Sequence, residues 1–360
     1  MRIGIEATTL LNRVPGGIAR YTSNLAEALI RLRAADHIIE LAMLYPLSRF
    51  PRRARIRTQV IAPTRWYLGN FWPVGNQYDV IHCTDVRFVR RRSARSVYTV
   101  YDLAIFRKEH QFEHYTDPVF RDKIFRRTRY AVEEADAIIA ISHCTKKDLM
   151  EMFGVPEHKI FVTHLAPDMR ATTLDAAGER VLDRYKLRAK QYYLFVGAVS
   201  VRKNVVNLVR AFQRCKSAGE LHLVLAGPLS MGIEQIQEEI QRLGLAARIL
   251  MPGFVPDRDL PALLAGAAGM LYPTYYEGFG LPVLEGMQAM VPVLAGNRGA
   301  VPEIAAGYAV LVDPFDVDEI AAGIDALASV SQAQLTRARA YASTFTWDKV
   351  AEQTLAVYQG

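Results

Sequence analysis

The chain has 360 residues, of which 51% are hydrophobic and 22% are charged, a balance that excludes wholesale disorder. Its length predicts about two domains. The longest run without a charged residue, 260–276, is interrupted by glycine and proline and is too short to span a bilayer. The three cysteines are far apart and lack the spacing of a zinc or redox site. Together with an N-terminus unlike a signal peptide, these features predict a cytoplasmic protein.

The net charge of +7 is concentrated in the first part of the chain. Residues 1–170 contain 27 Lys and Arg against 18 Asp and Glu, whereas residues 171–360 contain 17 against 19. A basic half beside a nearly neutral half indicates either an anionic partner for the first half or a basic surface that contacts only solvent.

Short apolar runs alternate with helical patterns along the first half. Strands are predicted at 2–6, 39–44, 79–82, 96–101, 136–141 and 159–162, with the main helices at 18–32, 119–135 and 145–153. After a polar connector the alternation restarts. Further strands are predicted at 192–196, 221–226, 248–251, 270–272, 292–295 and 309–312, with helices at 204–215, 231–243, 257–265 and 282–289 and a helical tail over 316–358.

Alternation of strands and helices indicates parallel sheets with right-handed crossovers. The sequence therefore predicts an α/β protein with two doubly wound, Rossmann-like domains, at 1–170 and 171–344. We expect a last helix, at about 345–360, to pack back on the first domain. Ligands of such domains bind beyond the carboxyl ends of the strands. The residues that bind a ligand are therefore expected in the loops that follow the strands.

Two glutamates, Glu277 and Glu285, frame the strongest motif, EGFGLPVLE, between the strand at 270–272 and the next helix. Gly278 and Gly280 allow backbone to approach a ligand closely, and the free N–H groups of a helix start attract anions such as phosphate. Glu285 is expected in the first helical turn, where the helix dipole favours its charge. The two carboxylates could hold two hydroxyl-bearing rings; the alternative is a solvated Glu277 and a capping Glu285.

A second motif carries cations. Gly197 follows the strand at 192–196, and Arg202 and Lys203 stand where the next helix starts. Fixed cations at this place could bind a diphosphate, Arg through two hydrogen bonds and Lys as a point charge. Taken alone, an Arg-Lys pair before a helix is more often simply solvated.

Three further loops follow predicted strands. Gly227-Pro228 is typical of a turn, and the loop at 295–303 is glycine-rich. The loop between them could present its backbone to the edge of a base, through Gly253, Phe254 and Val255. Asp257, which comes next, is predicted to cap the following helix.

The first half offers fewer candidates. Gly16 and Gly17 open a helix and could admit a phosphate or a sugar, although the dinucleotide fingerprint GxGxxG is absent. Tyr101 ends a predicted strand, and its phenol, with an ordinary pKa of about 10, can donate a hydrogen bond at neutral pH but cannot act as a base. His82 also lies at a strand end, where a structural role is favoured over a functional one.

Taken together, these residues resemble glycosyltransferase family 4, whose members have the GT-B fold, two Rossmann-like domains that face a cleft. The resemblance extends over almost the whole chain and is strongest from 192 to 312. It is carried by Glu277, Gly278, Phe279, Gly280, Leu281, Pro282 and Glu285, by Arg202, Lys203 and Asn204, by Gly227 and Pro228, by Gly253, Phe254 and Val255, and by Asn297, Arg298, Gly299, Pro302 and Glu303.

This resemblance implies a nucleotide-sugar site. Glu285 would bind the ribose, and Glu277 with the backbone of 278–280 would hold the transferred sugar. Arg202 and Lys203 would hold the diphosphate. The family usually retains the anomeric configuration and uses no metal; among these motifs the sequence shows no cluster of His, Asp and Glu with metal-ligand spacing, and fixed cations can stabilise a leaving diphosphate instead. We expect no cofactor, since the nucleotide sugar is a substrate.

Other positions complete this picture. The backbone of 253–255 would meet the base, and Gly16 and Gly17 would border the donor phosphate and the acceptor. Tyr101 replaces a histidine that many members carry near the transferred sugar, which puts a catalytic histidine in doubt. We expect Tyr101 to act at the reacting centre together with Arg202, Lys203 and Glu277.

The surplus positive charge gathers at 49–57, 87–95 and 121–129, where Phe residues lie among the basic ones. Such clusters suit an anionic membrane surface, and a solvated face that packs by its apolar side explains them equally well. Nucleic acid is not an expected partner, because no fold signature for it is present.

We therefore predict a retaining glycosyltransferase that moves a hexose, mannose from GDP-mannose by family analogy, to a lipid-linked or glycan acceptor. It would be cytoplasmic and a candidate for peripheral binding to the inner face of the membrane. One alternative is a nucleotide-sugar epimerase or hydrolase on the same fold. Another is a binder of anionic surfaces that has lost catalysis.

Overall fold

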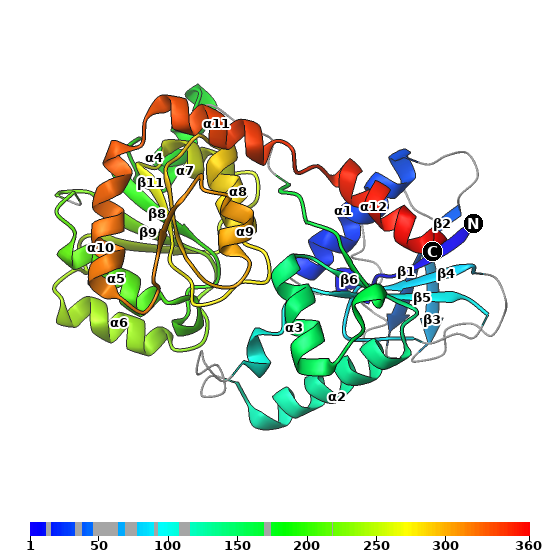
Figure 1. The fold of residues 1–360 in the computed structure, drawn as a ribbon. Helices are drawn as coiled ribbons and strands as arrows, with labels where there is room; N and C mark the ends of the chain where they lie inside the picture. The colour runs from blue at the N-terminus through cyan, green and yellow to red at the C-terminus, as the bar shows by residue number, and fades with distance from the viewer. Residues whose placement is uncertain are drawn as a thin grey trace. The chain divides into compact units, whose positions relative to one another are not determined.

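The computed structural model describes residues 1–11, 16–32, 38–45, 64–68, 78–89, 93–107, 116–168, 174–217 and 219–360. They form two compact units, each a parallel sheet flanked by helices (Figure 1). The first unit comprises Met1–Phe106, Thr116–Ala166 and Thr346–Gly360, and the second is built mainly from Pro167–Phe345. Within the described ranges, no helix combines the length and apolarity needed to cross a membrane. The predicted α/β class with two doubly wound sheets is confirmed.

The first sheet has seven strands in the order β3-β2-β1-β4-β5-β6-β7. These are β1 (Arg2–Glu6), β2 (Ile38–Tyr45), β3 (Thr64–Leu68), β4 (Val80–Cys83), β5 (Arg95–Val100), β6 (Ala137–Ala140) and β7 (Ile160–Val162). All were predicted within two residues except β3, which was missed. Its sequence, TRWYL, carries an arginine at its second position and has neither an apolar run nor a clean alternation, so it lacks the usual signal of a buried strand.

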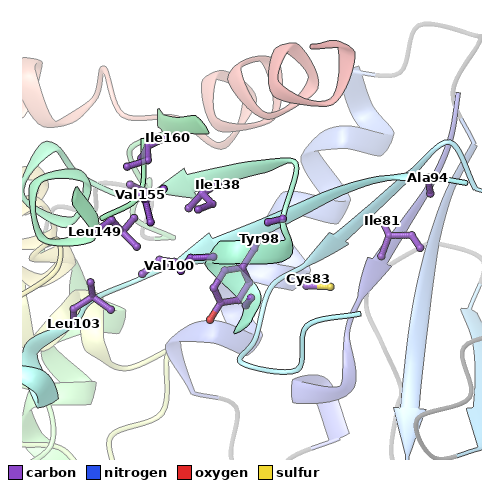
Figure 2. Close-up of a cluster of buried hydrophobic side chains, with 14 of the residues drawn as sticks. Ile81, Cys83, Ala94, Tyr98, Val100, Leu103, Ile138, Leu149, Val155 and Ile160 are labelled. Carbon is purple, nitrogen blue, oxygen red and sulfur yellow. The ribbon is translucent and has the colours of Figure 1, made fainter. Parts of the chain in front are cut away.

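Side chains of one parity on β4, β5 and β6 form one face of the first core. Cys83, Tyr98 and Ile138 lie side by side through the registers Cys83 with Tyr98 and Tyr98 with Ile138. Figure 2 shows these side chains in one buried cluster that extends along the sheet to Leu149 of a covering helix. Strands covered on both faces need apolar residues at every position, and the sequences VIHC and AIIA, buried throughout, come close to that.

Three helices of the first unit lie between its strands, and two of them begin at identifiable N-caps. They are α1 (Gly17–Leu32), α2 (Pro118–Glu134) and α3 (His143–Phe153). The Asp117 carboxylate accepts from the Val119 N–H at the start of α2, and the Ser142 hydroxyl accepts from the Thr145 N–H at the start of α3. Gly154 ends α3 in the left-handed conformation.

The second sheet has six strands in the order β10-β9-β8-β11-β12-β13. They are β8 (Tyr192–Val196), β9 (His222–Ala226), β10 (Ile249–Gly253), β11 (Gly269–Tyr272), β12 (Val293–Gly296) and β13 (Val310–Val312). The helices are α4 (Ala176–Arg184), α5 (Val205–Arg214), α6 (Ile233–Arg242), α7 (Leu260–Gly266), α8 (Leu281–Gln288), α9 (Val301–Ala305), α10 (Val317–Ala326) and α11 (Gln332–Ala342). Asp257 does not cap α7, which begins three residues later, after Asp259.

The last helix, α12 (Trp347–Gln359), belongs to the first unit (Figure 1). His82 on β4 is fully buried beneath it, with Nδ1 2.7 Å from the Tyr358 hydroxyl and Nε2 2.7 Å from the Thr99 hydroxyl. Burial lowers the pKa of His82 to about 3, so the ring is neutral. The Arg95 guanidinium adds a hydrogen bond to the Val357 carbonyl, 3.0 Å. The structural role favoured for His82 therefore holds, as the anchor of the last helix.

We expect Tyr358→Phe to lower the free energy of unfolding of the first unit by roughly 1–3 kcal/mol, because it leaves a buried imidazole nitrogen without a partner. Thermal and urea unfolding would measure the change. Tyr130→Phe, on a half-exposed ring, is the matched control. Equal stability of both variants would contradict the anchoring role of the His82–Tyr358 hydrogen bond.

A second buried titratable group lies at the carboxyl end of β1. Glu6 is fully buried; Oε1 accepts from the Thr8 N–H at 2.9 Å, and Oε2 has no hydrogen-bond partner among the described residues. Burial raises the pKa of Glu6 to about 7, even though the hydrogen bonds from Thr8 oppose the shift. The folded chain therefore retains the Glu6 proton at pH values where an unfolded chain would lose it.

Because the folded-state pKa of Glu6 lies above the unfolded value, stability from this group is full below about pH 4.5 and is lost as the pH rises towards 7. Glu6→Gln removes that loss. Relative to the wild type, we expect the free energy of unfolding of the variant to rise by about 3 kcal/mol between pH 4.5 and 8, as measured by urea unfolding. Glu133→Gln, on an exposed side chain, controls for the charge. A constant difference between variant and wild type across this range would contradict the raised pKa.

Candidate active site

Loops that leave β8 and β11 meet at the carboxyl edge of the second sheet. Lys203 ends the short 3-10 turn after β8, and Glu277 lies in the loop after β11; the two strands are neighbours in the sheet. The Lys203 ammonium lies 2.5 Å from Glu277 Oε1, and the two side chains are 12% and 13% exposed. The structure thus brings together a predicted phosphate ligand and a predicted sugar ligand from positions 74 residues apart.

Tyr272, the last residue of β11, completes this cluster and was missed from the sequence. The Lys203 ammonium lies 3.4 Å from the Tyr272 hydroxyl and 5.8 Å from the centre of its ring. The pKa of Tyr272 is raised well above its usual value, first by burial and then by the charge of Glu277 and a hydrogen bond to it. The charges of Arg202 and Glu285 also act on it, with opposite signs. A tyrosine inside an apolar run is typical of a core, so no pattern marked it.

Asn204 fixes the cationic turn. It adopts the left-handed conformation, with φ of 61°, and its amide nitrogen donates to the carbonyls of Pro273, at 2.7 Å, and Pro314, at 2.6 Å. These bonds tie the turn after β8 to the loops after β11 and β13. Within the described part of the chain, the guanidinium of Arg202 makes no hydrogen bond or ion pair, so this half-buried cation is available to an anion.

The loop that carries Glu277 rests on the loop after β12. The Ala300 N–H donates to the Glu277 carbonyl at 2.9 Å. Gly299 has φ of 63°, and a Cβ at this position would lie 2.5 Å from the Glu277 carbonyl oxygen. The glycine-rich loop predicted at 295–303 therefore supports the Glu277 loop, and only glycine fits at its closest approach.

Glu285 lies just beyond the first turn of α8, in which it was predicted. The helix starts at Leu281, after Gly280 in the left-handed conformation, so Glu285 is its fifth residue and no acidic residue stands in the first turn. The helix dipole is therefore not the reason for a glutamate here. Its side chain is buried and close enough to Tyr272 to act on the pKa of that phenol.

The residues between Glu277 and Glu285 are buried or half-buried. Gly278 and Phe279 are buried, and the Phe279 ring meets Phe345 edge-on at 6.3 Å. Since the Phe279 side chain serves the core, only backbone of this segment can reach a ligand.

Three glycines form the edge of the sheet on the other side of the cluster. The Gly227 N–H donates to the Gly253 carbonyl and the Gly197 N–H to the Ala226 carbonyl, each at 2.9 Å. A Cβ on Gly227 would lie 1.9 Å from the Gly197 carbonyl oxygen, so these loops pack backbone against backbone. Beside them, Phe254 is 54% exposed and Val255 is buried.

The first unit places its candidates differently. The Tyr101 hydroxyl donates its proton to the Thr84 carbonyl at 2.9 Å, and its ring meets Tyr21 edge-on at 5.4 Å. Burial raises the pKa of Tyr101 well above its usual value. In this structure the single proton of the phenol is donated to Thr84, so donation to a sugar would require this hydrogen bond to break. Gly16 and Gly17 are exposed at the start of α1.

Comparisons with known proteins identify the family of the chain. Residues 15–169 match the family model described as Glycosyltransferase Family 4, and residues 183–343 match that of Glycosyl transferases group 1. The O-antigen chain mannosyltransferase B of Escherichia coli is 30% identical over 306 residues, which are 80% of this chain and 76% of that protein. A mannosyltransferase of Mycolicibacterium hassiacum, the MMP alpha-(1->4)-mannosyltransferase, is 28% identical over 231 residues, 62% of this chain and 53% of that protein.

Solved structures share the fold. The crystal structure of HepE from Anabaena, in complex with UDP and glucose, superposes with a TM-score of 0.74 over 99% of this chain and 98% of that chain, at 17% identity. WaaG, a glycosyltransferase involved in lipopolysaccharide biosynthesis, superposes with a TM-score of 0.70 over the whole of both chains, at 14% identity. The chain therefore belongs to glycosyltransferase family 4 and is a glycosyltransferase of the GT-B fold.

Proposed function

We propose that this glycosyltransferase moves a hexose from a nucleotide sugar to a lipid-linked or glycan acceptor. In this proposal the carboxyl edge of the second sheet binds the donor. Arg202 and Lys203 hold the diphosphate, and Glu285 binds the ribose hydroxyls. Glu277 and the backbone of 278–280 hold the transferred sugar.

The observation that carries the proposal is the meeting of two cations and two carboxylates around one buried phenol. Arg202 is free of protein partners in the described residues, while Lys203 is held by Glu277. An arriving diphosphate would supply the anion that Arg202 lacks and compete with Glu277 for Lys203. Released from Lys203, the Glu277 carboxylate could accept hydrogen bonds from sugar hydroxyls. Charge-assisted hydrogen bonds of this kind are short and strong.

The backbone edge next to this cluster suits the base. Gly253 and the residues after it follow β10, two strands away from β8 in the sheet. The exposed Phe254 ring could cover a face of the base.

The sugar proposed is mannose and the donor GDP-mannose. The support is that two relatives are named mannosyltransferases. HepE was solved with UDP and glucose, so a uridine donor is the competing choice.

We propose a reaction with retention of configuration and without a metal ion. The bond between the anomeric carbon and the diphosphate oxygen breaks, and the acceptor oxygen bonds to that carbon from the same face. The acceptor proton passes to an oxygen of the leaving diphosphate. Arg202 and Lys203 stabilise the negative charge that develops there, the task a metal would otherwise perform.

We expect Glu285→Ala to weaken nucleotide-sugar binding at least about 10-fold, because the ribose hydroxyls lose a charged hydrogen-bond acceptor. Calorimetric titration follows a thermal-shift panel of GDP, UDP, ADP and their sugar derivatives, which selects the nucleotide by its stabilisation of the wild type. Glu234→Ala, on an exposed side chain of α6, is the control. Unchanged affinity in Glu285→Ala would remove the ribose role, and no response of the wild type to the panel would refute the donor site.

The alternative of an epimerase or hydrolase needs a donor site but no acceptor. Turnover of the selected nucleotide sugar by the wild type alone, at the rate seen with acceptor present, would favour it. Transfer that depends on an added glycan or lipid-linked acceptor favours the proposal.

We further propose that α2 binds an anionic membrane surface that presents the acceptor. Of the three basic clusters, 49–57 lies outside the described residues and 87–95 is described only in part, whereas 121–129 lies on α2. Val119 is 73% exposed, Phe120 52% and Tyr130 50%.

The spacing places these apolar residues beside basic ones. Positions 119, 123, 127 and 130 follow one another at three or four residues and therefore share a helix face. Lys123 and Arg127, both exposed, lie between Val119 and Tyr130 on it. Exposed apolar side chains interspersed with cations are typical of helices that lie in a membrane interface, and each cation near an anionic surface contributes roughly 1 kcal/mol.

We expect the double variant Lys123→Glu/Arg127→Glu to lose most of the binding to vesicles of mixed neutral and anionic phospholipid, measured by co-sedimentation at low and physiological salt. Arg180→Glu/Arg337→Glu changes the same charge on exposed residues of the second unit and should bind like the wild type. Binding of the wild type to purely neutral vesicles with equal strength, or equal losses in both double variants, would contradict a role for α2.

A further inference from the structure

Tyr272 occupies the centre of the candidate donor site without being one of the expected ligands. It ends β11, its side chain is buried, and its ring stacks on Phe195 from the neighbouring strand β8, with centres 6.0 Å apart and planes at 28°. Gly197, just after the same strand, has φ of 146°, and a Cβ there would make an ordinary contact with the Tyr272 ring at 4.0 Å. The Tyr272 ring is therefore fixed by its own strand, β11, and by packing against β8.

The hydroxyl of Tyr272 has two polar neighbours. It accepts a hydrogen bond from the Lys203 ammonium at 3.4 Å, and a hydrogen bond to Glu277 contributes to its raised pKa. Because that pKa is well above 10, the phenol keeps its proton at every pH at which enzymes of this kind work, and it can donate and accept at the same time.

The ammonium group of a lysine needs a neighbouring group to orient it more than the guanidinium of an arginine does. The ammonium is a point charge on a flexible stem with four rotatable bonds, and it has no planar fork to orient it. When a diphosphate displaces Glu277 from Lys203, the ion pair can no longer fix the ammonium. The phenol oxygen and the ring face beneath it, 5.8 Å from the ammonium, would remain in place.

We propose that Tyr272 is a positioning residue that orients Lys203 towards the diphosphate of the donor and holds the Glu277 carboxylate beside the sugar. This inference rests on the proposed function, since it assigns a role relative to the same diphosphate. It places the effect of Tyr272 on the terminal phosphate rather than on the nucleoside.

The test compares calorimetric affinities for GMP and GDP, and for UMP and UDP, in four proteins: the wild type, Tyr272→Phe, Lys203→Ala and the double variant. Tyr272→Phe retains the ring, its stacking on Phe195 and its volume, and removes only the hydroxyl. We expect it to weaken diphosphate binding about five- to tenfold, which is within the range for one lost hydrogen bond, and to leave monophosphate binding within about twofold.

The double variant separates action through Lys203 from an independent effect. If Tyr272 works through Lys203, then Tyr272→Phe costs little further diphosphate affinity once Lys203 has been replaced by Ala. Tyr192→Phe is the matched control, since the Tyr192 hydroxyl, on β8, donates to the Leu263 carbonyl at 2.5 Å, away from the cluster. We expect it to leave both affinities unchanged.

Two results would overturn the inference alone: wild-type-like diphosphate binding by Tyr272→Phe, or equal weakening of mono- and diphosphate binding. Additive losses in the double variant would overturn the route through Lys203 in the same way. Absence of nucleotide binding by the wild type would instead refute the proposed function, and this inference with it.

Discussion

The ion pair between Lys203 and Glu277 depends on the order of strands in the second sheet. Because β8 lies directly beside β11, the loops that leave their carboxyl ends are forced into contact, although 74 residues separate the two side chains. Asn204 then locks the arrangement through the carbonyls after β11 and β13. The right-handed crossovers that produce this strand order therefore also produce the candidate site, and the glycines beneath it only make the close approach sterically feasible.

The pair is also held at an electrostatic cost. Both side chains are nearly buried, and a buried ion pair recovers its desolvation only if its geometry is good and its remaining groups are hydrogen-bonded. Tyr272 supplies that second partner to both ions. An anion that binds between Arg202 and Lys203 exchanges one counter-charge for another. The resting state of the site is thus already organised for charge, which reduces the reorganisation needed when a ligand arrives.

Much of this could be predicted from the sequence, and the failures have physical causes. Apolar runs gave nearly every strand because strands covered on both faces must be apolar; β3 escaped because its arginine breaks that pattern. The resemblance to glycosyltransferase family 4 joined Arg202, Lys203, Glu277 and Glu285 into one set. It could not show that Lys203 pairs with Glu277, because pairing depends on strand order. Tyr272 was invisible because a tyrosine that packs and a tyrosine that positions a cation share the same pattern.

The placement of α12 affects the order in which the two units can fold during synthesis. The main part of the second unit, Pro167–Phe345, lies between Ala166 and Thr346 of the first, so the second unit is complete in the nascent chain while the first still lacks a helix. The His82 imidazole gains its second hydrogen-bond partner only after Tyr358 has been synthesised. Since domains tend to fold as units during synthesis, the second unit is able to fold first even though it is the later one in sequence.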